Sequence, residues 1–150
     1  MSSHLKGAYI LFLRMPERKR VRVGRLGTYS FPKGTYAYVG SAMNGLEPRI
    51  RRHFSREKRI HWHIDYLLDA GEAIQAILVP GENRMECMLN RLVDGLPGSK
   101  SIVKGFGSSD CNCHSHLHSI PSSSMRFLEN LSGSQLWIRG QRPAGIGRVN

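Results

Sequence analysis

The sequence lacks any long apolar run and has few cysteines. The longest apolar stretch near its start, residues 8–13, ends at Arg14 and is far too short to cross a bilayer. The first residues also lack a basic stretch followed by an apolar region and a small-residue cleavage site, so we expect a cytoplasmic protein with no membrane contact. Three cysteines, an odd number, argue against a disulfide framework and leave thiolates free to bind a metal.

Acidic residues are scarce in the first part of the chain. Residues 1–59 hold 14 Lys and Arg against 3 Asp and Glu, whereas residues 60–150 hold 8 of each, so the first part carries the whole net charge of +11. A concentrated positive field attracts polyanions and speeds their encounter with the protein. The alternative is a solvated surface that only keeps a small protein in solution. We favour nucleic acid as the partner, because the charge coincides with the motifs described below.

The apolar pattern predicts four strands. Residues 7–14 form a largely apolar segment typical of a buried strand, and residues 21–23 alternate as its neighbour. Residues 35–39 are rich in strand-forming types, and residues 73–79 resemble them. We expect the first three to form an antiparallel meander, with Tyr36 and Tyr38 on one face because side chains alternate along a strand.

Helical spacing predicts three helices. The first begins between residues 44 and 47, buries Leu46, Ile50 and Phe54, and turns a polar stripe outward. That stripe consists of Arg49, Arg52, His53 and Arg56. A second helix is expected over residues 61–68, and a third over residues 83–94 with Met85, Leu89 and Leu92 as its apolar side. The expected fold is an α/β (α+β) domain with a small mixed, mainly antiparallel sheet flanked by three helices.

The length of 150 residues suits a single domain, which we assign to residues 1–120. Residues 121–150 are rich in Ser and Gly. Two alternatives stay open for this segment: a flexible tail, or a tail from which residues 136–138 dock as a short strand.

Two short tyrosine-glycine signatures precede the basic helix. Gly7-Ala8-Tyr9 opens one expected strand, Tyr38-Val39-Gly40 closes another, and the basic residues of the helix follow after a short loop. In this order and spacing the chain resembles the GIY-YIG nuclease superfamily over roughly residues 6 to 118. It looks closest to a branch of uncharacterised small domains in archaea and bacteria that are sometimes attached to an endonuclease III-type repair enzyme.

The resemblance implies a site for phosphodiester hydrolysis. It implies that Tyr9 helps to deprotonate the attacking water, Tyr38 supports that geometry, Arg49 binds the phosphate, and Glu86 holds Mg²⁺ or Mn²⁺. A single carboxylate completed by waters suits these cations. An ordinary tyrosine has a pKa of about 10, so Tyr9 would need the positive field of Arg49 and its neighbours to act as a base.

Each of these residues also has a structural interpretation. The tyrosines can be half-buried strand aromatics, and Arg49 can be a solvated helix charge. Glu86 can cap a helix that begins at Asn83, because Asn at the N-cap and Glu three residues later fit a variant of the capping box. We leave metal binding and capping open for Glu86.

Five neighbouring residues complete the predicted site. His53 lies one turn after Arg49 and is expected to reach the phosphate or the reacting water. We assign nucleic-acid binding to Arg52, Arg56, Ser41 and His63. Ser41 departs from the family pattern, because many family enzymes have a basic residue directly after the second signature. The chain also offers no separate DNA-binding domain, which such nucleases commonly carry.

The cysteines predict a second metal site. Cys111 and Cys113 lie close to several histidines, and Cys87 can complete a set of soft ligands. Our candidate ligands for a structural Zn²⁺ are Cys87, Cys111, Cys113 and His116; His116 is chosen because its surroundings resemble the related domains. Three reduced thiols without metal are the open alternative. Neighbouring helix residues point about 100° apart, so Glu86 and Cys87 are expected to serve different sites.

Three functions follow from these observations. The first is a metal-dependent endonuclease acting on structured or damaged DNA in repair. The second is a non-catalytic nucleic-acid-binding module, with a zinc-stapled C-terminal segment, that delivers a partner such as a DNA-repair glycosylase/lyase. The third is a zinc-stabilised interaction protein whose charge is incidental. DNA is favoured over RNA, although no element of a known base-reading type is present.

Overall fold

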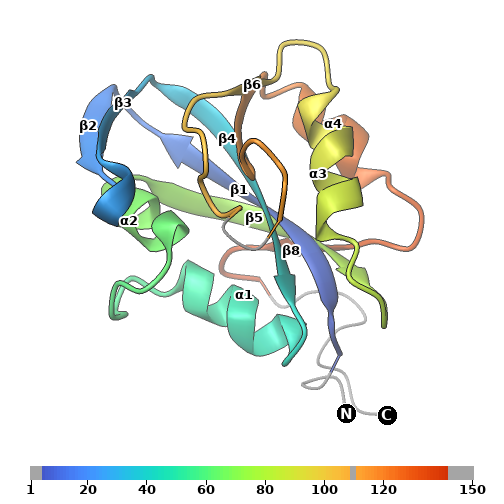
Figure 1. Ribbon diagram of the computed structural model, residues 1–150. Helices are drawn as coiled ribbons and strands as arrows, with labels where there is room; N and C mark the ends of the chain where they lie inside the picture. Colours follow the sequence, from blue (N-terminus) through green and yellow to red (C-terminus); the bar gives the residue numbers. More distant parts are fainter. Residues whose placement is uncertain (1–4, 109–110, 142–150) are drawn as a thin grey trace.

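A six-stranded sheet forms the centre of the molecule (Figure 1). The computed structural model describes residues 5–108 and 111–141. The sheet has the order β6-β7-β4-β1-β5-β8, and every pairing in it is antiparallel. Its strands are β1 (Gly7–Met15), β4 (Gly34–Ala42), β5 (Glu72–Pro80), β6 (Lys100–Ser101), β7 (Leu117–Ile120) and β8 (Gln135–Ile138). The predicted α+β class, with a mainly antiparallel sheet flanked by helices, is confirmed.

Helices cover both faces of this sheet. On one face α1 (Leu46–Phe54) and α2 (His63–Ala70) pack against Tyr9, Leu11 and Leu13 of β1. On the other, α3 (Glu86–Asp94) and α4 (Ser124–Glu129) pack against the intervening positions of the same strand. A central strand buried on both faces is apolar throughout, which is why residues 7–14 show little alternation.

The predicted meander is wrong. β1 pairs directly with β4, and β2 (Lys19–Arg22) and β3 (Thr28–Phe31) form a separate two-stranded sheet joined by a short 3₁₀ helix, Gly24–Leu26. The reason is burial, because the charged side chains of β2 cannot occupy a sheet position that is covered on both faces. The expected shared face of Tyr36 and Tyr38 is present, since both belong to the core beneath α1 and α2.

The C-terminal segment adds a helix and an edge strand to the fold. β8 pairs with β5 and buries Trp137, whose ring packs edge-on against Phe54 of α1. The short strand left open for residues 136–138 is therefore present, and α4 was not predicted. The rest of the expected tail, residues 142–150, lies outside the described residues.

The predicted helices differ in detail from the expectation, and α2 runs over His63–Ala70 and not over residues 61–68. α3 begins at Glu86, three residues later than predicted, and it buries Val93 while Leu92 is 37% exposed. The expected α1 stripe buries Leu46 and Ile50, with Phe54 packed at the edge of the core. Among residues 5–108 and 111–141, none of the helices has the length and apolar character that crossing a membrane requires.

A buried carboxylate, Asp65, joins the two helices beside the tyrosines. It accepts two hydrogen bonds from the Arg52 guanidinium, both 2.8 Å long, and one from each of the backbone amides of His61 and Trp62 at 2.9 Å. Burial alone would raise the pKa of Asp65, but the hydrogen bonds from Arg52, Trp62 and His61 outweigh it and lower the pKa. The segment before α2 is thereby fixed against α1.

The Asp65–Arg52 pair gives a prediction about stability. We expect Asp65→Asn to lower the free energy of unfolding at pH 7 by about 3 kcal/mol, because Arg52 keeps its charge without a buried partner. The folded-state pKa of Asp65 lies below its unfolded value of about 3.9. The stabilisation is therefore complete above that unfolded value and is lost as the pH falls through the folded one. Urea titrations at pH 7 and pH 3 measure both effects.

A matched control is Glu47→Gln, which breaks the exposed i,i+4 pair with Arg51. Surface pairs of this kind contribute about 0.5 kcal/mol or less. If both variants lose the same free energy of unfolding at pH 7, Asp65 stabilises the fold no more than a surface charge does.

Candidate functional site

One cavity of about 480 Å³ collects most of the predicted site residues. Its walls come from β1, β4, α1, the segment before α2, the start of α3 and the loop that precedes β7. Seven predicted residues line it: Tyr9, Tyr38, Ser41, Arg49, His53, His63 and Glu86. Residues far apart in the sequence thus line one polar cavity.

The two signature tyrosines lie on the same face of the sheet. Tyr9 is paired with Gly40, Leu11 is paired with Tyr38, and the two phenol rings are 6.3 Å apart between centroids. A Cβ atom on Gly40 would lie 2.6 Å from the Tyr9 hydroxyl oxygen, closer than real Cβ contacts come. The glycine of the second signature is therefore required because the phenol of the first one crosses over its backbone.

Tyr9 forms a buried pair with His53. Its hydroxyl oxygen is 2.7 Å from His53 Nε2, and Tyr9 is only 1% exposed. Burial raises the pKa of Tyr9 to about 12, although the Arg49 charge opposes the rise. Burial, Lys58 and Arg49 together lower the pKa of His53 to about 3. At neutral pH a protonated phenol therefore shares this hydrogen bond with a neutral imidazole, and the tautomer of His53 decides which of the two donates.

The position of His53 corrects the sequence prediction. His53 was expected on the outer stripe of the helix, but it is 2% exposed and faces the sheet. The partner that draws it inward is the Tyr9 hydroxyl, which no helical periodicity can reveal. Its second ring nitrogen, Nδ1, is buried with no hydrogen-bond partner among the described residues.

Arg49 is held over an aromatic ring. Its guanidinium lies 4.4 Å from the centre of the Trp62 ring and donates a hydrogen bond of 2.9 Å to the backbone oxygen of Ser41. Arg52 lies at the same distance from the same ring. Cation–π contacts of this kind restrain a guanidinium without neutralising it. Sequence reasoning missed Trp62, although its place between two histidines and beside the arginine helix was a usable signal.

Glu86 points into the cavity and does not cap a helix. α3 begins at Glu86 itself and has no side-chain cap, so the capping alternative that we left open for Asn83 and Glu86 does not hold. Glu86 Oε1 accepts a hydrogen bond of 2.8 Å from the Ser41 hydroxyl and lies 3.7 Å from the Arg84 guanidinium. Ser41 thereby orients the carboxylate.

The remaining predicted nucleic-acid contacts are engaged within the protein. Arg52 is bound to Asp65, and Arg56 donates to the backbone oxygen of Gly71 outside the cavity. His63 Nδ1 accepts a hydrogen bond of 2.9 Å from the amide of Gly107, and burial lowers its pKa. Of these three residues, only His63 reaches the cavity.

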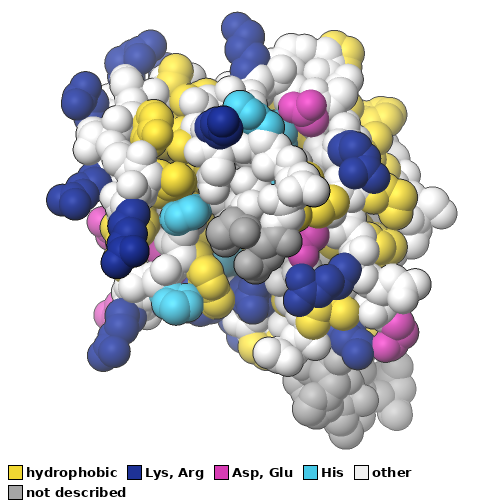
Figure 2. Space-filling view, viewed as in Figure 1, with side chains coloured by type: hydrophobic (Ala, Val, Ile, Leu, Met, Phe, Trp, Pro, Cys, Tyr) yellow, Lys and Arg dark blue, Asp and Glu magenta, His cyan; other side chains and the backbone are white. Residues whose placement is uncertain are grey.

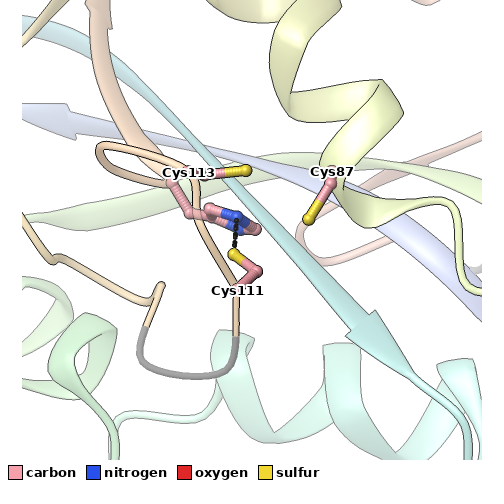
Figure 3. Close-up of side chains that lie close together, drawn as sticks. Cys87, Cys111 and Cys113 are labelled. Carbon is pink, nitrogen blue, oxygen red and sulfur yellow. Dashed lines mark hydrogen bonds between the residues drawn. The ribbon is translucent and has the colours of Figure 1, made fainter.

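A second cluster consists of Cys87, Cys111, Cys113 and His116. Their ligand atoms all lie within 4.8 Å of one another, and the three thiols turn toward a common centre (Figure 3). Cys87 comes from α3, whereas the other three come from the segment that leads into β7. The four residues can bind a metal ion, and they are the four ligands predicted from the sequence.

His116 is oriented as a metal ligand would be. It is fully buried, its Nδ1 donates to the backbone oxygen of Val39 at 2.9 Å, and its Nε2 lies 3.3 Å from Cys111 Sγ. A hydrogen bond on one ring nitrogen fixes the tautomer and leaves the other nitrogen free to bind. Burial, followed by hydrogen bonds with Cys113 and Cys111, raises the pKa of Cys87, an effect that a bound cation would reverse.

The two clusters adjoin but remain distinct. Glu86 lines the tyrosine cavity while Cys87, the next residue, belongs to the thiol cluster, as the angle between neighbouring helix residues led us to expect. His116 reaches across to Val39, which stands between Tyr38 and Gly40 in β4. The thiol cluster is therefore positioned to support the strand that carries the second signature.

Comparisons with known proteins place the chain in a family but add no relative of known activity. Neither a search of curated proteins nor a search of solved structures found a match. A family model described as "Domain of unknown function DUF123" matches residues 8–135, which span every element from β1 to the first residue of β8. The chain belongs to the DUF123 family.

Proposed function

We propose that this protein is a metal-dependent endonuclease of the GIY-YIG type that hydrolyses phosphodiester bonds in nucleic acid. The observation that supports it most is the convergence of Tyr9, Tyr38, Arg49, His53 and Glu86 on one cavity. These residue types supply what the reaction needs: a cation for the phosphoryl oxygens, a proton acceptor and a carboxylate for a divalent metal.

Arg49 is the phosphate-binding group in this proposal. Trp62 and the Ser41 carbonyl hold its guanidinium in place, and among the described residues no carboxylate forms a salt bridge with it. Its charge is therefore available to an anion. A guanidinium oriented in advance needs little reorganisation when negative charge develops on the phosphoryl oxygens.

Tyr9 and His53 act together as the proton acceptor. A phenol with a pKa of about 12 does not ionise at neutral pH in isolation, but an imidazole nitrogen that can accept its proton lies 2.7 Å away. When the attacking water gives a proton to the Tyr9 oxygen, the phenolic proton passes to His53 Nε2. The Arg49 charge favours the phenolate character that Tyr9 acquires in this step.

Glu86 is the proposed ligand for Mg²⁺ or Mn²⁺. It is the only carboxylate among the described residues that line the cavity, and its oxygen Oε1 is oriented by Ser41. A single carboxylate, waters and substrate oxygens suit these hard cations. When bound, the metal would supply Lewis-acid activation of the phosphate and of the attacking water.

Structured or damaged DNA is the substrate we favour. The described elements that line the cavity include no helix or strand presented for reading base edges, so selection by shape is more consistent with the site than selection by sequence. Action beside a repair glycosylase/lyase, and a cytoplasmic location, stay predictions.

One observation favours a second candidate, a nucleic-acid-binding module without catalysis. Tyr9 is only 1% exposed, and burial raises its pKa. A tyrosine that only packs in the core would show the same two properties as one that takes part in proton transfer. In that case Arg49 would still bind phosphate, but no bond would be cleaved.

A cleavage assay separates the two candidates. We expect the protein with Mg²⁺ or Mn²⁺ to nick supercoiled plasmid or cut branched DNA, and Glu86→Gln and Tyr9→Phe each to lower the rate at least 100-fold. Glu129→Gln, a carboxylate of α4 that does not line the cavity, is the matched control and should cleave normally. Binding without cleavage in every metal, by folded wild-type protein, would favour the binding module.

We further propose that the thiol cluster holds a structural Zn²⁺. Three thiolates and one imidazole are a usual tetrahedral zinc set, and sulfur ligands at about 2.3 Å from zinc lie within about 4 Å of each other. The cluster, with all ligand atoms within 4.8 Å, needs only a small contraction to meet that geometry. The metal would join α3 to the segment before β7.

Metal analysis tests this site. We expect one zinc per chain in protein purified under reducing conditions, and its loss in Cys111→Ser together with a fall of several degrees or more in Tm, because a structural zinc contributes folding energy. His114→Ala removes an exposed imidazole close to the cluster but outside it, and should keep the metal. If wild-type protein is purified without zinc and has the same Tm with and without added zinc, the thiols only pack together.

A further inference from the structure

The small two-stranded sheet, β2–β3, carries a basic surface that the proposed active site does not use. Residues 18–46 contain six Lys or Arg and no Asp or Glu. Five of the six are exposed, and the outer face of β2 presents Arg20 and Arg22. Among the described residues, none of these five forms a salt bridge with a carboxylate.

The pairing of the two strands places hydroxyl groups beside the arginines. Arg20 is opposite Ser30 and Arg22 is opposite Thr28, so all four side chains share the outer face. Arg18 reaches the same face, where its guanidinium donates to the Ser30 hydroxyl. Guanidinium and hydroxyl groups are the side chains that most often contact phosphate and sugar in nucleic-acid complexes.

The inner face of the same strands is used to attach the sheet to the protein. Val21 and Tyr29 pack against the main core, and Lys19 donates a hydrogen bond of 2.8 Å to the backbone oxygen of Ala70 at the end of α2. The Tyr66 side chain of α2 contacts Gly24 between the two strands. The basic surface is therefore held in a fixed place relative to α2.

α2 runs between the cavity and the point where the β2–β3 sheet is attached. Its first residue, His63, lines the cavity, whereas its last residue, Ala70, receives Lys19. A helix of eight residues is about 12 Å long, which corresponds to roughly three or four base pairs at 3.4 Å each. Several Lys and Arg side chains lie along the edge of the molecule that carries β2 and β3, at the left of the view, and others are spread over the rest of this face (Figure 2).

We propose that the outer face of β2–β3 binds the phosphate backbone of a nucleic-acid duplex next to the segment held in the cavity. The proposal rests on nucleic acid being the partner, but it does not depend on cleavage. The surface has no aromatic side chain on its outer face for stacking single-stranded bases. Double-stranded backbone, recognised without reference to sequence, is therefore the ligand that its chemistry fits.

The test compares two double variants in a Glu86→Gln background, so that no substrate is cleaved. Arg20→Gln/Arg22→Gln removes two charges from the β2–β3 face, and Arg91→Gln/Arg126→Gln removes two exposed charges from α3 and α4. Binding to a labelled duplex of about 24 base pairs is measured by fluorescence anisotropy over a range of salt. A thermal unfolding scan of each protein checks that the fold is kept.

We expect the β2–β3 variant to bind roughly tenfold more weakly at low salt, with the slope of log affinity against log salt reduced by about 1.8, since each lost phosphate contact removes about 0.9. The α3/α4 variant should change affinity less than about twofold. Equal weakening by both variants, or none by either, would overturn the proposal, because placement of the charges would then be irrelevant.

Two further arms separate this inference from its rivals. If substitution of Arg20 and Arg22 weakens binding to a single strand more than binding to a duplex, the face binds single strands instead. Loss of binding to phosphatidylserine vesicles with unchanged duplex binding would assign it to anionic membranes. If the wild-type protein fails to cleave DNA in the cleavage assay while the β2–β3 variant still loses duplex binding selectively, that result would contradict the proposed nuclease activity and support this inference.

Discussion

The crossing of the Tyr9 phenol over the backbone of Gly40 is the contact on which the candidate site depends. It exists only because β1 and β4 pair with Tyr9 opposite Gly40. A slip of one residue would turn Tyr9 to the α3 face, since side chains alternate along a strand. The same contact brings the Tyr9 hydroxyl to His53, so β-pairing, glycine identity and helix placement are linked at one point.

Two groups of polar residues lie in the walls of the cavity around this contact. Asp65 joins α1 to the segment before α2 and thereby sets Trp62 against Arg49. The thiol cluster places Cys87 of α3 beside the segment before β7, and its His116 donates a hydrogen bond to Val39 of β4. Hydrophobic packing is non-directional, so it cannot define the position of a guanidinium or a carboxylate to a fraction of an ångström. Buried hydrogen bonds are directional, so they can define such a position.

The sequence was informative where a physical constraint leaves a local trace. The signature glycines, the apolar spacing of Leu46 and Ile50 and the grouping of the cysteines all led to features present in the structure. Features set by distant partners left no such trace. His53 was placed outside because its partner Tyr9 lies 44 positions away, and β8 was uncertain because its strand partner β5 precedes it by about 60. The role of Asp65 left no such trace either, since nothing near it in the sequence identifies Arg52 as its partner.

In the proposed hydrolysis, the opposite pKa shifts of Tyr9 and His53 mean that the pair needs other charges nearby before it can act as a base. With Tyr9 near 12 and His53 near 3, moving the phenolic proton to the imidazole is strongly uphill in the free protein. A bound phosphate favours the imidazolium but opposes the phenolate, because it raises the pKa of both groups. A divalent cation at Glu86 does the reverse. Together they favour the charged pair only if the phosphate lies nearer to His53 and the cation nearer to Tyr9, so the proposed base depends on where the two ions bind.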